Sequence, residues 1–140
     1  MAGRTFAIGD IHGDLQQLFV LLSRLPVLDS RDTIVFLGDY VDRGPQSAQV
    51  VAYIRKLPEQ TPAKVVMLRG NHEDAWLRVV AQGWDNFVLP PLNGCLAAYR
   101  SFGPEIRLLA EIRTSSMVEF VYRRIRCPAF TCQAWLYTAA

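Results

Sequence analysis

The stretch TIVFLGDYVDRGP, residues 33–45, decides the fold of this sequence. Its first part is a short run of β-branched and apolar residues, which predicts a buried strand. Its second part is a turn that holds two glycines, two aspartates and an arginine. Beyond this turn Ser47 can cap a helix, and the apolar residues at helical spacing are Val50, Val51, Ile54 and Leu57. The stretch therefore predicts a strand, a polar turn and a helix in succession.

The same pattern occurs before and after this stretch. Residues 5–8 form an apolar run ahead of a polar turn at residues 9–14, and residues 64–68 form another ahead of a turn at residues 69–74. Strands that are apolar on both faces and alternate with helices favour a parallel sheet with helices on both faces. We therefore predict an α/β fold built from βαβ units. Right-handed crossovers bring the three turns to the carboxyl edge of such a sheet, where open α/β sheets bind ligands.

The composition is that of an ordinary globular domain. The chain has 140 residues, of which 51% are hydrophobic and 20% charged, and this fits one domain rather than a disordered or fibrous protein. No apolar run approaches the length of a membrane span, so we expect no membrane partner. The three cysteines are odd in number and lack a CxxC spacing, which argues against a disulfide framework. Because no hydrophobic leader precedes Asp10, we expect a cytoplasmic protein.

The charge is distributed unevenly along the chain. Residues 1–111 hold 11 basic and 12 acidic residues, a balance of −1, whereas residues 112–140 hold 4 basic residues and 1 acidic residue, a balance of +3. Since only the end of the chain is basic, a nucleic acid is not an expected partner.

Charged and polar side chains crowd the three predicted turns. They are Asp10, His12, Asp39, Asp42, Arg43, Asn71 and His72. Carboxylates gathered at one edge of a sheet repel one another unless a cation lies among them, so we predict a metal site. Oxygen ligands mixed with imidazole suit Mn, Fe or Zn, and the absence of cysteine from these turns argues against a closed structural zinc site. The site is therefore expected to be open and catalytic.

Asp39 has the central position among the predicted ligands. If it lies between the other two turns, its two oxygens can bridge two divalent ions. One ion would take Asp10, His12 and Asp39. The other would take Asp39 and Asn71, which are too few ligands by themselves.

The remaining polar residues suit a phosphate group. Arg43 is planar and always charged, and it has the shape to hold two phosphate oxygens. His72 can protonate a leaving oxygen, with its orientation set by Asp42. Trp76, on the helix predicted after the third turn, is interpreted as a packing residue.

Three strings in these turns resemble the N-terminal signature motifs of the calcineurin-like metallophosphoesterases. They are Gly9-Asp10-Ile11-His12-Gly13, Gly38-Asp39-Tyr40-Val41-Asp42-Arg43-Gly44 and Gly70-Asn71-His72-Glu73. The resemblance is closest to the bacterial branch of the serine/threonine phosphoprotein phosphatases. It implies a hydrolase with two divalent metal ions, in which hydroxide bound to metal attacks the phosphorus of a phosphoprotein or a small phosphoester. A diadenosine polyphosphate hydrolase of the same superfamily stays open as the alternative.

The resemblance also implies a role for each residue of the motifs. The implied metal ligands are Asp10, His12, Asp39 and Asn71, with Asp39 as the bridge. The implied phosphate-binding residues are Arg43 and Asn71. The implied catalytic residues are Arg43, Asp42 and His72, the last two as the general acid pair. By the same resemblance, Glu73 supports the turn electrostatically.

The resemblance covers the first part of the chain only. That family completes its second metal site with two further histidines, whereas this sequence has only His12 and His72. We therefore expect the second metal site to be incomplete. We interpret residues 1–111 as a partial metallophosphoesterase domain, the N-terminal half of the sandwich followed by a helical segment. Residues 112–140 are interpreted as an atypical tail, left by truncation or a frame shift.

An incomplete domain has two expected consequences. The alternative to an active enzyme is a catalytically impaired fragment that keeps a partial metal site. A half-sheet also leaves an edge strand unpaired, so we expect a tendency to self-associate.

Overall fold

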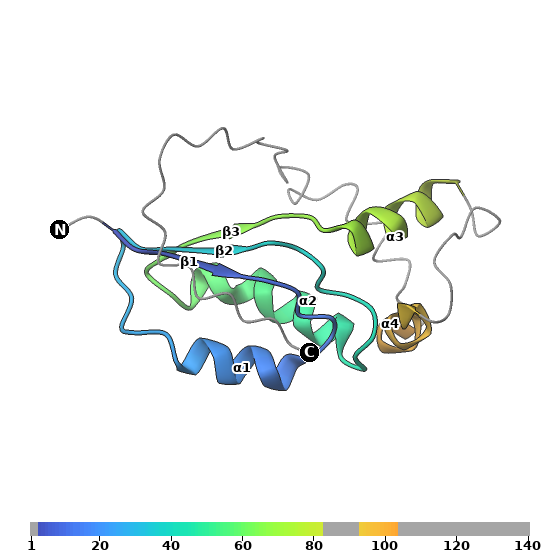
Figure 1. The fold of residues 1–140 in the computed structure, drawn as a ribbon, viewed down its shortest axis with the longest axis horizontal. Helices are drawn as coiled ribbons and strands as arrows, with labels where there is room; N and C mark the ends of the chain where they lie inside the picture. Colours follow the sequence, from blue (N-terminus) through green and yellow to red (C-terminus); the bar gives the residue numbers. More distant parts are fainter. Residues whose placement is uncertain (1–2, 83–92, 104–140) are drawn as a thin grey trace.

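The computed structural model describes residues 3–82 and 93–103, which form a three-stranded parallel sheet and its helices (Figure 1). The strands are β1 (Thr5–Ile8), β2 (Thr33–Phe36) and β3 (Lys64–Met67), in the order β1-β2-β3. The α-helices are α1 (Leu15–Ser23), α2 (Ser47–Lys56), α3 (Asn71–Gln82) and α4 (Cys95–Phe102), and a 3-10 turn, η1 (Leu57–Glu59), follows α2. The prediction of an α/β fold made of consecutive strand-turn-helix units is confirmed.

The three strands end level with one another. In the parallel register, Ile8 lies opposite Phe36 and Phe36 lies opposite Met67. The turn that follows each strand therefore starts at the same edge of the sheet. This register gives three segments far apart in sequence a common location.

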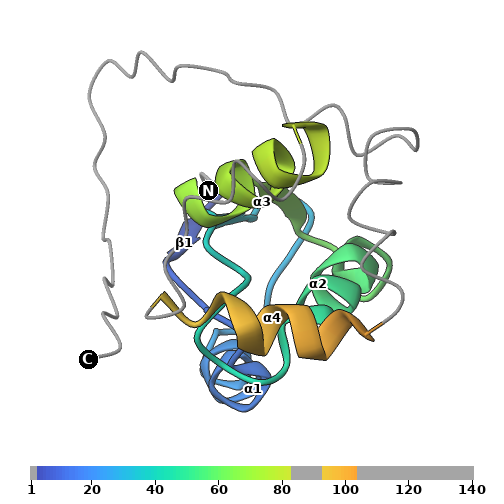
Figure 2. The ribbon, with the colours of Figure 1, turned by 90° about the vertical axis from the view of Figure 1, so that its right-hand side faces the viewer.

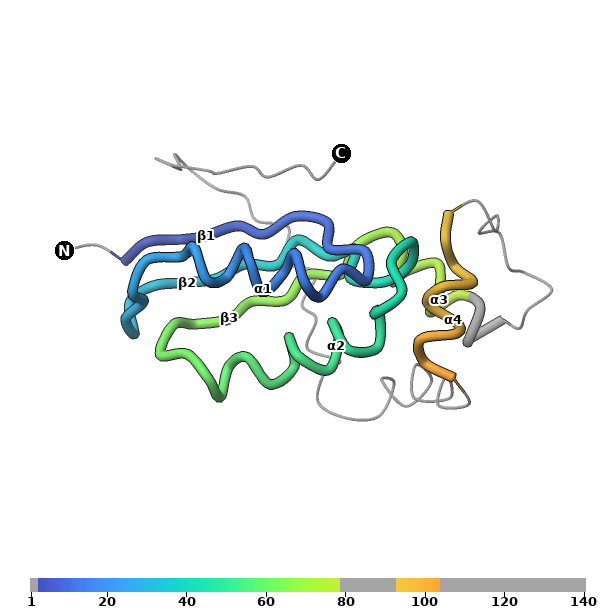
Figure 3. Tube along the Cα trace, turned by 90° about the horizontal axis from the view of Figure 1, so that it is seen from below, coloured from blue at the N-terminus to red at the C-terminus, as the bar shows by residue number. Residues whose placement is uncertain are grey.

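One face of the sheet forms the core with two helices. α1 and α2 cover this face, as Figures 1 and 3 show, and Ile8, Ile34 and Phe36 of the strands are buried in the core. Leu18 of α1 is buried in this core, and so is Val50 of α2, which belongs to the predicted apolar stripe. α3 lies on the other side, beyond the carboxyl ends of the strands, and α4 crosses in front of that edge (Figures 1 and 2).

The first residue of α2 differs from the sequence prediction. Ser47 was expected to cap this helix, but Gln46 holds the cap position and Ser47 is already helical. The hydroxyl of Ser47 is buried and accepts the amide N–H of Asp42 at 3.2 Å. Ser47 therefore joins α2 to the second polar turn rather than to its own helix end.

Some predictions lie outside the described residues. The boundary at residue 111 and the interpretation of residues 112–140 as a tail both fall there. In the part of the chain that is described, no helix is long and apolar enough to cross a membrane.

Candidate functional site

The first two turns are joined by their backbones. The amides of Ile11 and His12 both donate to the carbonyl of Asp39, at 3.0 and 2.9 Å. The amide of Gly13 donates to the carbonyl of Tyr40 at 2.8 Å, and the amide of Gly44 returns to the carbonyl of His12 at 2.8 Å. These hydrogen bonds hold the turns after β1 and β2 as one unit.

Glu73 joins the third turn to the second. Its carboxylate accepts the amides of Asp39, Tyr40, Val41 and Gly70, at 2.8, 2.8, 3.2 and 3.0 Å. Burial raises the pKa of Glu73, because desolvation of the charged form outweighs the four backbone donors that favour it. The sequence resemblance assigned Glu73 a supporting role, and these contacts give that role a physical form.

Two glycines allow the second and third turns to meet. A Cβ added to Gly70 would lie 2.0 Å from Oδ1 of Asp39, and one added to Gly38 would lie 2.2 Å from the amide nitrogen of Gly70. Gly38 also has a φ of +110°, which L side chains rarely adopt. A larger residue at either position would push the two turns apart.

Backbone strain is concentrated in these turns. His12, Asp39, Asp42 and Arg43 have φ values of +47°, +54°, +72° and +63°. In residues 3–82 and 93–103 they are the only residues other than glycine with positive φ. Such conformations cost on the order of 1 kcal/mol each and persist where surrounding contacts enforce them, most often at functional sites. All four are among the site residues predicted from the sequence.

His12 presents a bare nitrogen at this edge. Its Nδ1 lies 2.9 Å from the carbonyl oxygen of Val41, and since a carbonyl only accepts, Nδ1 carries a proton. In the neutral ring, Nε2 then has a free lone pair. Nε2 is the one buried side-chain polar atom without a hydrogen-bond partner in the part of the chain that is described. The nearest carboxylate oxygen paired with it is Oδ2 of the exposed Asp10, at 3.5 Å. An imidazole held through one nitrogen, with the other left open, is the usual arrangement of a metal ligand.

Three side chains can act together as ligands. His12, Asp39 and His72 each offer one ligand atom, and these atoms lie within 4.8 Å of one another. The two imidazole rings meet edge to face with their centroids 4.6 Å apart. The amide of His72 donates to Oδ1 of Asp39 at 3.1 Å, which fixes that carboxylate. Two imidazoles and a carboxylate form a donor set that suits a divalent transition metal.

Asp42 lies beneath this cluster with both oxygens engaged. Nδ1 of His72 lies 2.6 Å from Oδ2 of Asp42, and the indole Nε1 of Trp76 donates to Oδ1 at 2.7 Å. Asp42 is fully buried, and Trp76 is 3% exposed. His72 and Asp42 were predicted from the sequence as site residues, whereas the polar contact of Trp76 was not. The available signal was spacing, because Trp76 follows His72 by one helical turn on α3.

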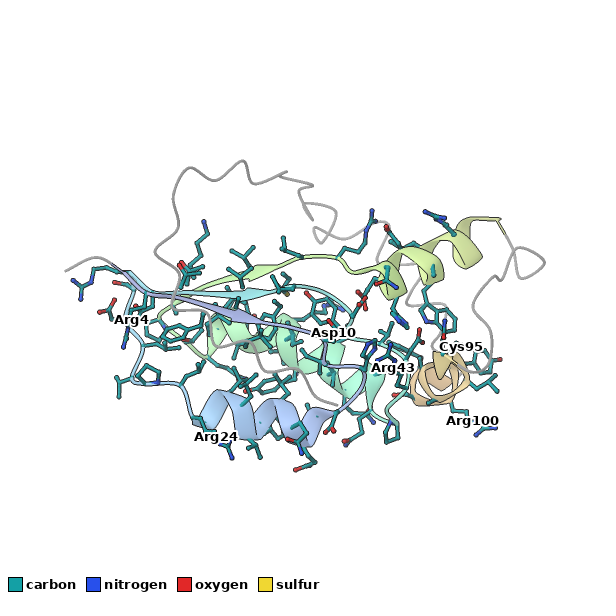
Figure 4. All side chains as sticks on the ribbon, viewed as in Figure 1. Arg4, Asp10, Arg24, Arg43, Cys95 and Arg100 are labelled. Carbon is teal, nitrogen blue, oxygen red and sulfur yellow. The ribbon has the colours of Figure 1, made fainter. Side chains whose placement is uncertain are left out.

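The other predicted residues lie at the same edge. Asn71 is the first residue of α3 and is exposed. Arg43 is exposed, and its amide donates to the carbonyl of Gly94 at 3.2 Å, just before α4. Figure 4 shows Asp10 and Arg43 at the carboxyl end of the strands, with Cys95 of α4 nearby. All seven predicted residues thus come from turns that share one edge, although their individual roles stay predictions.

Comparisons with known proteins agree with this picture. A family model described as calcineurin-like phosphoesterase matches residues 3–125. The chain is 31% identical over 138 residues to the serine/threonine-protein phosphatase SIT4 of Candida albicans, covering 81% of this chain and 44% of that protein. It is 37% identical over 94 residues to a symmetrical bis(5'-nucleosyl)-tetraphosphatase of Pectobacterium atrosepticum, covering 67% of this chain and 32% of that protein.

A solved structure shows the same likeness. A protein serine/threonine phosphatase from Saccharomyces cerevisiae superposes with a TM-score of 0.51 at 25% identity, covering 76% of this chain and 30% of that one. The chain spans less than half the length of each of these relatives.

Proposed function

Because the chain belongs to the calcineurin-like phosphoesterase family, we propose that its carboxyl-edge site hydrolyses phosphoesters with the help of divalent metal. The observation that carries this proposal is the bare, buried Nε2 of His12. It lies beside carboxylate and imidazole ligand atoms. No described group donates a hydrogen bond to it. A buried lone pair without a partner is unfavourable unless a cation completes it.

The donor set fits one ion better than two. Asp10, His12 and Asp39 would hold the first ion, and Asp39 with Asn71 would face the second. His12 and His72 are the only histidines of the sequence. His72 lies within reach of the same ion, but we assign it to proton transfer, so no histidine is left for a second ion. We propose Mn, Fe or Zn, with Mn²⁺ as the first ion to test, because imidazole and carboxylate ligands suit these ions. A bound divalent ion supplies an activated water and offsets negative charge on the phosphoryl oxygens.

The chain's own residues would bind the phosphate and complete the reaction. Arg43 is exposed beside the cluster and can hold two phosphoryl oxygens by charge-assisted hydrogen bonds. His72, kept in place by Asp42, would donate a proton to the leaving oxygen as its bond to phosphorus breaks. Asn71, at the start of α3, would add a contact to the phosphate.

Phosphoserine and phosphothreonine proteins are the substrates we propose first. The likeness to SIT4 covers the larger share of this chain and supports this choice. The likeness to the tetraphosphatase favours a second candidate, a dinucleoside polyphosphate. Comparing turnover of a phosphoserine peptide with turnover of diadenosine tetraphosphate distinguishes the two. We also propose a cytoplasmic site of action, from the composition and cysteine arguments above.

The test of the proposed reaction uses the full chain with Mn²⁺ and p-nitrophenyl phosphate. Asp39→Asn is expected to lower kcat by at least about 100-fold, because it removes a charged ligand from the site. Asp29→Asn is the matched control, since Asp29 is an aspartate at the opposite edge of the sheet, paired with Arg31. Equal activity in wild type and Asp39→Asn would refute the proposal. Binding of metal by the wild type without turnover would instead establish the impaired fragment.

Self-association through a sheet edge is a separate proposal. Within the described residues, β1 and β3 each form an edge of the sheet. Unpaired edges present backbone donors and acceptors to a second chain. Light scattering at rising protein concentration is expected to show a growing average mass, and a constant monomer mass would refute this.

A further inference from the structure

We propose that Trp76 is a positioning residue, whose indole N–H orients the Asp42 carboxylate so that it holds His72 toward the leaving group. This inference rests on the proposed function, which gives His72 the proton donor's role. In this proposal Trp76 acts through Asp42, to which its indole N–H donates.

The geometry leaves the Asp42 carboxylate no freedom to rotate. Trp76 Nε1 occupies Oδ1 at 2.7 Å and His72 Nδ1 occupies Oδ2 at 2.6 Å. The backbone of Asp42 is fixed as well, since its amide donates to Ser47 and its φ is +72°. Hydrogen bonds to a charged acceptor are stronger than neutral ones, above all in a buried place. Each oxygen thus has one assigned donor.

Both donors come from one helix. His72 and Trp76 are four residues apart on α3 and face the same carboxylate. Asp42 is fully buried, so water cannot replace a lost donor without rearrangement of the site. A phenylalanine at position 76 would fill most of the same space but would leave Oδ1 unpaired. The carboxylate would then turn to recover a partner, and the hydrogen bond to His72 would weaken.

The orientation of His72 affects the step in which the leaving oxygen receives a proton. With Nδ1 engaged by Asp42, Nε2 is the nitrogen of His72 that can give up a proton. When the bond between phosphorus and the leaving oxygen breaks, that oxygen keeps the electron pair and takes the proton from Nε2. The imidazole ends neutral, with its Nδ1–H still on Asp42. A serine alkoxide needs this proton far more than p-nitrophenolate does, because it is the more basic leaving group.

The first test reads the hydrogen bond directly by NMR, whether or not the chain turns over. In Trp76→Phe, the His72 ring N–H is expected to exchange with water at least about tenfold faster than in the wild type, as a charged hydrogen bond is weakened. Tyr40→Phe is the matched control, since it also removes one buried aromatic donor, the hydroxyl that donates to Leu68. It is expected to leave the His72 exchange rate unchanged. An unchanged rate in Trp76→Phe would overturn the proposal.

The second test uses substrates that differ in leaving group. With Mn²⁺, Trp76→Phe is expected to lower kcat for a phosphoserine peptide at least about tenfold more than kcat for p-nitrophenyl phosphate. A general loss of stability would lower both alike, as expected for Tyr40→Phe. Equal losses on the two substrates in Trp76→Phe would therefore overturn the proposal. If Trp76→Phe does not fold, Trp76→His, whose ring N–H can still donate, replaces it and must keep the wild-type ratio of the two activities.

These outcomes separate the inference from the proposed function. If His72→Asn lowers kcat equally for the two substrates, the role proposed for His72 is wrong. If His72→Asn lowers kcat more for the phosphoserine peptide and Trp76→Phe does not, only the role of Trp76 is wrong.

Discussion

Both ends of the sheet carry charged and polar residues, but they differ in how completely these residues are hydrogen-bonded. At the amino edge, the buried Asp32 accepts the Arg4 amide at 2.8 Å, Arg4 Nε at 3.1 Å and the Asp29 amide at 3.0 Å, and Nη2 of Arg4 completes the ion pair at 2.5 Å. At the carboxyl edge, Nε2 of His12 is buried without a partner. Residues of the carboxyl edge also hold the strained φ angles, whereas the residues of the Asp32 cluster have none.

The carboxylates of the two ends differ in the same way. The hydrogen bonds from Arg4 hold the pKa of Asp32 well below its usual range. Burial instead raises the pKa of Glu73 at the carboxyl edge. A cluster whose charges are all paired stabilises the fold. A cluster that leaves a buried ligand atom without a partner is suited to bind an ion or ligand. This difference, rather than the number of charges, distinguishes the functional end of the sheet.

The largest expected effect comes from removing the open nitrogen alone. His12→Asn keeps a side-chain N–H near the position of Nδ1, where it can still donate to Val41, but it lacks Nε2. Asparagine also tolerates a positive φ better than most residues. The affinity for Mn²⁺, measured by calorimetry, is therefore expected to fall by at least about 100-fold, while the Tm of the metal-free chain stays the same. A lower Tm with unchanged affinity would make His12 a structural residue, like Asp32.

A smaller effect is expected from Glu73→Gln. A glutamine offers one acceptor oxygen where four amides now converge, and its own N–H groups would face those amides. The second and third turns should then separate, so Mn²⁺ affinity is expected to fall about tenfold, the range typical of residues that support ligands. Metal titration checks the affinity. An affinity equal to that of the wild type would show that Glu73 does not position the ligands.

At the amino edge, Asp32→Asn is expected to lower the Tm and leave Mn²⁺ affinity within about twofold. Because the pKa of Asp32 is lowered in the folded chain, its contribution to stability is present above its usual value of 3.8 and is lost as pH falls through the lowered pKa. Thermal melts of the metal-free chain should therefore show a decrease in Tm below about pH 4 that is smaller in Asp32→Asn. The same decrease in both chains would contradict the assignment.

The helices and strands could be predicted from the sequence, because short-range patterns determine them. All three strands begin at the predicted residues, Thr5, Thr33 and Lys64, and a helix follows each polar turn as predicted. β-branched runs and helical spacing need no knowledge of distant contacts. The convergence of the turns followed from the topology of parallel sheets, which is equally general.

The details of the site could not be predicted, because they depend on contacts between turns. The positive φ of His12 is held by hydrogen bonds to Asp39 and Gly44, about 30 residues away in sequence. The hydroxyl of Ser47 serves Asp42 rather than its own helix for the same reason. Trp76 was interpreted as a packing residue. In the sequence, a tryptophan on a helix looks the same whether its indole only packs or also donates a hydrogen bond.

The most direct test of the account is the amount of divalent metal that the purified full chain binds. Equilibrium dialysis against Mn²⁺, followed by elemental analysis, is expected to find one tightly bound ion per wild-type chain and none in His12→Asn. Asp32→Asn should bind as the wild type does. Absence of bound ion in the wild type, or equal binding by His12→Asn, would contradict the claim that the open nitrogen at the carboxyl edge is a metal ligand.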